Sequence, residues 1–100
     1  MAKKIDGVIE AVRMKNGQIA AVRAFERRGA AYSDWLLLDR KTLLERLREG
    51  RSFVTGSREK FLAGTFKQDR PVWLVSAGGN EFISTREQAD ADILEGVPFF

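Results

Sequence analysis

The sequence predicts a mainly β domain of the α+β class: a small antiparallel β-barrel or half-open barrel of about seven strands with one central amphipathic helix. Three observations predict it. An Asn-Gly pair separates two apolar runs, one leucine-faced helical pattern follows, and short β-branched or aromatic runs come after the helix. With 100 residues, 44% of them hydrophobic and 31% charged, the chain has the size and composition of one domain, residues 1–100.

The first two strands are expected to form a hairpin around Asn16-Gly17, which separates the runs 8–15 and 18–25. Asn-Gly supplies the two positive φ angles of a type I′ turn. A two-residue loop pairs residues so that Met14 faces Ile19 and Glu10 faces Arg23. One face of this hairpin is bulky and apolar and the other is rich in alanine, so that a further element of the chain or a second subunit can approach it closely.

Residues 32–38 end in three consecutive leucines, which indicates a strand covered on both faces. The next segment predicts a helix over residues 40–49. Asp39 is a natural N-cap, Gly50 is a natural residue after the C-cap, and the leucines of the segment fall on one helical face.

The remainder of the chain predicts an antiparallel meander of short strands at residues 51–55, 61–67, 72–76 and 81–85, separated by turn residues. The pattern from Thr85 to Gln88 resembles a capping box and predicts a short helix toward Ile93. Closing the meander into a barrel removes exposed strand edges, with the central helix as its cap or plug. The alternative is a flat sheet with the helix on one face.

Missing residue types argue against an enzyme. The chain has no His and no Cys, which excludes thiol catalysis, disulfides, zinc fingers and iron–sulfur clusters. No nucleophile lies in a recognisable sequence context, and the glycines of residues 56–65 lack the Lys-Ser/Thr of a phosphate loop. The acidic residues lack the spacing of a cation loop. We therefore expect a non-enzymatic protein without cofactor or metal.

The start of the chain has no apolar stretch of the signal-peptide type, and no segment approaches the length of a membrane span. A cytoplasmic location without a membrane partner is the resulting expectation.

The first hypothesis for function is a binding module that acts by protein–protein contact or self-association. Two features motivate it: the small-residue face of the hairpin and the aromatic tail Val97-Pro-Phe-Phe. The tail either folds back onto its own domain or docks onto a neighbouring chain, because an exposed pair of phenylalanines favours aggregation. The candidate contact residues are Ala20, Val22, Ala24, Phe99 and Phe100.

The alternative is a small barrel that binds nucleic acid in a basic groove, with aromatic side chains stacking on bases. Residues 1–70 hold 16 basic and 9 acidic residues, whereas residues 71–100 hold 1 and 5, so one part of the chain can attract an acidic partner. Against this reading, the aromatic residues lie inside apolar runs, where burial is the simpler role. The candidate groove residues are Arg13, Lys15, Arg27, Arg28, Arg58 and Lys60.

Overall fold

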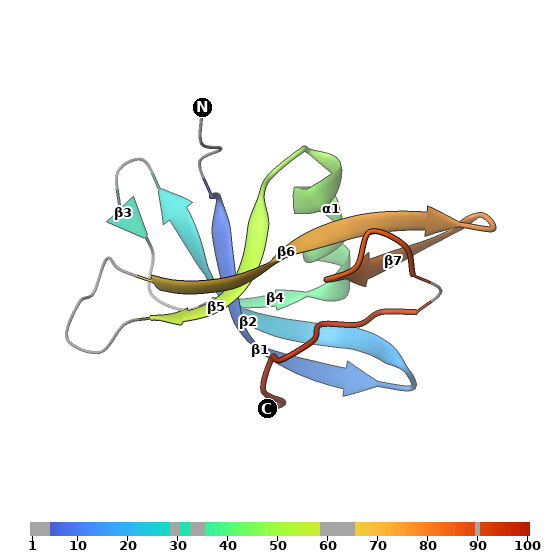
Figure 1. Cartoon of the computed structure of the whole chain (residues 1–100), viewed down its shortest axis with the longest axis horizontal. Coiled ribbons are helices and arrows are strands. Elements are labelled where there is room, and N and C mark those ends of the chain that lie inside the picture. Colours follow the sequence, from blue (N-terminus) through green and yellow to red (C-terminus); the bar gives the residue numbers. More distant parts are fainter. Residues whose placement is uncertain (1–4, 29–30, 33–35, 59–65, 90) are drawn as a thin grey trace.

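The computed structural model describes residues 5–28, 31–32, 36–58, 66–89 and 91–100. These residues form a mainly β fold with one helix, as the sequence predicts (Figure 1). The elements in chain order are β1 (Gly7–Lys15), β2 (Gln18–Arg28), β3 (Ala31–Tyr32), β4 (Leu36–Asp39), α1 (Arg40–Arg48), β5 (Phe53–Arg58), β6 (Phe66–Ala77) and β7 (Asn80–Ser84).

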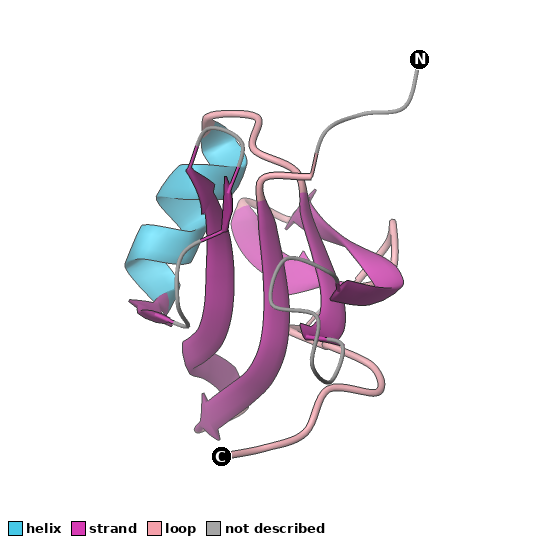
Figure 2. Ribbon diagram, turned by 90° about the vertical axis from the view of Figure 1, so that its left-hand side faces the viewer, coloured by secondary structure: helices cyan, strands magenta, loops and turns pink. Residues whose placement is uncertain are grey.

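The strands form a mixed sheet and do not close into a barrel through the pairings of the described residues. Their order is β3-β2-β1-β5-β6-β7, and β4 pairs with β2 beside β3. The prediction of an all-antiparallel arrangement is wrong at one position, because β1 and β5 are parallel. The chain passes through β4 and α1 between β2 and β5, and such a crossover returns β5 beside β1 in the same direction. The helix lies against one side of the strands (Figure 2), which is closer to the alternative architecture.

The β1–β2 hairpin has the expected turn, with φ angles of 53° at Asn16 and 76° at Gly17. Its predicted register is confirmed at both ends, where Met14 pairs with Ile19 and Val8 with Phe25. It is wrong in the middle, because the two strands carry irregularities at different places.

One extra residue, Ala20, lies on β2, and one, Glu10, lies on β1, so the two shifts cancel. Between them Val12 pairs with Val22, and Ala11 rather than Glu10 faces Arg23. Val12 and Val22 therefore share the core face, and side-chain alternation places Arg13 and Arg23 together on the opposite face.

The helix has the predicted ends. The side chain of Asp39 accepts a hydrogen bond from the backbone N–H of Thr42 at 2.8 Å, and Gly50 follows the helix with a φ of 85°. Leu43 and Leu44 are buried against the sheet. The core cluster joins these leucines to buried side chains from the strands and the C-terminal segment: Ile9, Val12, Ile19, Val22, Ala24, Leu38, Phe53, Val72, Ile83 and Val97.

The two strands predicted at residues 61–67 and 72–76 correspond to one long strand, β6, although residues 61–65 lie outside the described part. The predicted turn at residues 68–71 is absent. Pro71 is tolerated because β5 has an irregularity between Val54 and Gly56, where the Thr55 hydroxyl accepts from the N–H of Arg70 at 3.1 Å. The turn at Gly78-Gly79 between β6 and β7 is confirmed.

The predicted helix after Thr85 is also absent from the described residues. Residues 91–100, here called the C-terminal strap, instead cross the sheet with a turn at Glu95-Gly96 (Figure 1). Ile93 forms a parallel bridge with Ser84, and Phe99 forms one with Val12. The strap therefore joins the β7 end of the sheet to β1.

Candidate protein-contact site

The edge of β1 changes partner halfway along the strand. β5 pairs with Gly7, Val8 and Ile9 only. Beyond them the strap takes the place of β5: the N–H of Val12 donates to the carbonyl of Pro98 at 2.9 Å, and the N–H of Phe100 donates to the carbonyl of Val12 at 3.1 Å. The tail of the chain thus folds back as a short added strand.

Two arginines hold the ring of Phe100. The guanidinium carbons of Arg13 and Arg23 lie 4.7 Å and 4.8 Å from the ring centroid. Arg13 Nε also donates to the Phe100 carbonyl at 3.3 Å. Each cation–π contact at a partly exposed position contributes about 0.5–1 kcal/mol. We call Arg13, Arg23 and the β1 backbone at Val12 the β1 seat.

Phe99, by contrast, is 77% exposed. Its backbone is fixed on both sides, because Pro98 and Phe100 are each hydrogen-bonded to Val12. The structure therefore presents a large apolar ring to solvent on a backbone that cannot easily turn it inward.

The buried carboxylate of Asp92 ties the beginning of the strap to the sheet. It accepts backbone N–H groups from Ile19 of β2 and Ile83 of β7, both at 3.0 Å. Arg40 at the start of α1 donates to it through Nε at 2.8 Å. One side chain thereby connects the helix and two strands that are not neighbours in the sheet.

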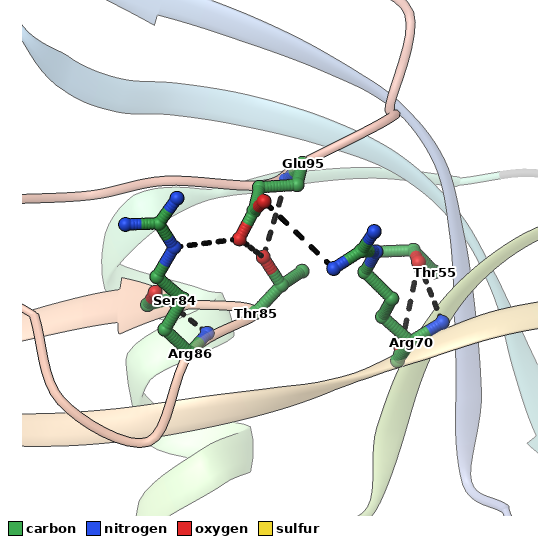
Figure 3. A network of polar contacts seen from close by, with 6 residues as sticks. All are labelled: Thr55, Arg70, Ser84, Thr85, Arg86 and Glu95. Atoms are coloured by element: carbon green, nitrogen blue, oxygen red, sulfur yellow. Dashed lines mark hydrogen bonds and ion pairs between the residues drawn. The ribbon is translucent and has the colours of Figure 1, made fainter.

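Glu95 provides the next anchor of the strap (Figure 3). Its carboxylate accepts from Arg86 Nε at 2.8 Å and lies 3.7 Å from Arg70 Nη1, and its backbone N–H donates to the Thr85 hydroxyl at 3.2 Å. The strap is therefore fixed to β6 and to the end of β7 up to Glu95.

Both anchoring carboxylates have altered acidity. Burial acts to raise the pKa of Asp92, but hydrogen bonds from Arg40, Ile19 and Ile83 outweigh it, so the pKa lies below its ordinary value. The hydrogen bond from Arg86 lowers the pKa of Glu95.

Acid is therefore expected to destabilise the fold through these groups. A carboxylate with a depressed pKa in the folded state stabilises the fold above its unfolded pKa, which is about 4, and this contribution is lost as the pH falls through the folded value. The free energy of unfolding, measured with urea, should be level from about pH 5 to 8 and fall below about pH 4. The fall should be shallower in Asp92→Asn; equal slopes in both proteins would contradict the assignment.

The candidate contact residues of the hairpin and the tail differ in how far they are buried. Val22 and Ala24 are fully buried in the core of the chain itself and offer no surface to a partner. Ala20 is half-buried at the irregularity of β2. The accessible candidates are therefore Ala20 and the two phenylalanines of the strap.

The candidate groove residues do not come together in the described part of the chain. Arg13 and Lys15 lie near the turn of the hairpin, whereas Arg27 and Arg28 lie at the other end of β2. The side chains of Arg28 and Arg58, and all of Lys60, lie outside the described part. β2 runs from Gln18 to Arg28, ten residue-to-residue steps that span about 33 Å along an extended strand.

Two residues of this surface lie in surroundings that differ from the prediction. The three leucines predicted a strand covered on both faces, which is wrong at Leu37: this residue is 58% exposed and, as the register partner of Arg23, places an apolar side chain beside the β1 seat. Arg23 itself was expected opposite Glu10, and only the irregularities of the hairpin bring it over Phe100. Neither feature has a local signal in the sequence.

A cavity of about 360 Å³ lies between the strap and the β5–β6 pair. It is lined by Glu10, residues 55–57 and 67–69, and residues 96–98. Within the described ranges no ion pair joins Glu10, Lys67 or Asp69 to another residue. Residues 96–98 of the strap therefore border this cavity on the side of β5.

Comparison with known proteins gives no relative. No protein-family model, no curated protein and no solved structure matches the chain significantly. Among the residues that the structure describes, no helix is long and apolar enough to span a bilayer. The same residues contain no cluster of three or more acidic side chains placed to hold a metal ion.

Proposed function

We propose that this chain is a small non-enzymatic binding module that acts by protein–protein contact, and that self-association is the form this contact takes. The exposed ring of Phe99 on its fixed backbone is the observation that supports the proposal. Aromatic side chains held in place before binding lose little conformational entropy on association and are common interface anchors.

The face of the hairpin away from the core also has the composition of an interface. Arg13, Arg23 and Phe100 form a stacked group there, and Leu37 lies beside Arg23 on the neighbouring strand. Aromatic residues and arginine are enriched at protein interfaces, whereas lysine and acidic residues are depleted. This composition favours a protein surface as the partner.

Phe99→Ser is expected to weaken self-association about 30-fold, which corresponds to a hot-spot residue of about 2 kcal/mol. The measurement is sedimentation velocity over a range of protein concentrations. Phe99 contributes little to the core, so the thermal midpoint of unfolding should stay nearly unchanged.

Trp73→Ser is the matched control, because Trp73 is also a partly exposed aromatic residue but lies on β6, which β5 separates from the hairpin. It should leave the monomer–dimer equilibrium unchanged. An intact chain that stays monomeric at every concentration would contradict the proposal.

The nucleic-acid alternative makes a different prediction. A labelled single strand should bind the chain, and its affinity should fall steeply as salt is added.

A further inference from the structure

The last residues of the strap occupy the β1 seat, so their contacts show which kind of ligand the seat accepts. The ligand is an extended segment that exchanges two backbone hydrogen bonds with Val12 and inserts an aromatic ring beside two guanidinium groups. Backbone bonds of this kind are the basis of recognition by strand addition, and the aromatic ring adds selectivity.

The part of the strap that fills the seat is attached to the rest of the molecule by one pivot. The strap is anchored up to Glu95 by its contacts with Arg70, Thr85 and Arg86. Gly96 follows with a φ of 76°, and a Cβ at this position would lie 3.3 Å from the Asp69 carboxylate. A change in backbone angles at Gly96 redirects residues 97–100 without disturbing the Glu95 anchor.

Within the part of the chain that the structure describes, no strand pairs with residues 97–100 on the side away from β1. The cavity between the strap and the β5–β6 pair is lined there by Val97 and Pro98. Leaving the seat therefore breaks the contacts with β1 and removes Val97 from the core, and among the described residues it breaks no strand pairing on the other side.

From these observations we infer that the β1 seat binds residues 97–100 of a second copy of the chain, so that two copies associate by exchanging these segments about Gly96. This inference rests on the proposed self-association and names its mechanism. Exchange restores the same contacts in the partner, so its cost is small. Four extended residues reach at most about 14 Å, so the two hairpins must meet closely beside the strap, where Phe99 is exposed.

The first test uses a synthetic peptide with the sequence of residues 95–100, labelled with a fluorophore, and a chain carrying Phe99→Ser/Phe100→Ser. This variant keeps Val97 and should have a near-native thermal midpoint. Anisotropy should show at least about tenfold tighter peptide binding to the variant than to the intact chain, whose own tail competes at a high effective concentration. If the folded variant does not bind the peptide, the inference that the β1 seat binds residues 97–100 of a second copy is wrong.

Two altered peptides provide matched controls. A peptide with the residue equivalent to Phe100 changed to alanine should lose about tenfold in affinity, because the ring no longer stacks on Arg13 and Arg23. The same change at the Phe99 equivalent should have a smaller effect, because that ring lies outside the seat. The reverse order of these two effects would contradict the inference.

The second test is sedimentation of mixed variants of the full chain. Phe100→Ala removes the same stacked ring from the closed monomer and from the exchanged dimer, so it should change self-association by less than about threefold. An equimolar mixture of Phe100→Ala with Arg13→Ala/Arg23→Ala should associate about tenfold more tightly than either variant alone, because exchange between the two restores one intact pairing of Phe100 with the arginines. A mixture that associates no more tightly than its components would overturn segment exchange, and an intact-chain dimer that is lost in Phe99→Ser would leave the proposed function standing. A monomeric intact chain would overturn both.

Discussion

Asp92→Ala is expected to lower the free energy of unfolding by about 3–5 kcal/mol, because it removes the buried carboxylate of a partly buried ion pair, which is also the acceptor of two buried N–H groups. The substitution leaves Arg40 without its carboxylate and the N–H groups of Ile19 and Ile83 without acceptors. Typical domains are stable by only about 5–15 kcal/mol, so the loss should be visible as a lower urea midpoint.

Glu81→Gln is the matched control for this experiment. Glu81 also pairs with an arginine of the helix, Arg48, but both side chains are partly exposed. Exposed pairs contribute about 0–1 kcal/mol, so the control should change the urea midpoint only slightly. Equal losses in the two variants would show that the Asp92 carboxylate does not hold the helix and strands together.

Gly56→Ala is expected to cost about 3 kcal/mol of stability, at the upper end of the range for overpacking. An added Cβ would overlap the Lys67 carbonyl oxygen and force the two strands apart. Both groups belong to paired backbone, since Gly56 faces Gln68 in the β5–β6 register, so no side-chain rotation relieves the contact.

The control is Ser57→Ala on the neighbouring exposed position of β5, which should change stability by no more than about 0.5 kcal/mol. Chemical unfolding of the three proteins under the same conditions provides the comparison. A Gly56→Ala protein as stable as the control would mean that β5 and β6 separate easily at this point.

Features that depend on a few adjacent residues could be predicted from the sequence. Asn16-Gly17 fixes the hairpin turn, and Asp39 and Gly50 fix the ends of the helix, because turn angles and caps are local properties. The mainly β class follows from the same local patterns.

Features that depend on distant residues could not be predicted. The parallel pairing of β1 with β5 depends on where the crossover returns, and the irregularities at Glu10 and Ala20 have no residue signature. Because these irregularities bring Arg13 and Arg23 to one face, the seat for Phe100 was also beyond prediction. The sequence left open whether the tail folds back, and Asp92 had no assigned role.

The edge of β1 pairs with β5 along its first part and with the strap at Val12. This division imposes an order on folding during synthesis. The hairpin of β1 and β2 consists of neighbouring residues and can form early, whereas Val12 contacts a residue 87 positions later. Until residues 97–100 have emerged from the ribosome, half of this strand edge stays open beside the nascent chain. A chaperone that shields extended edges would therefore be most useful to this protein before these residues reach β1.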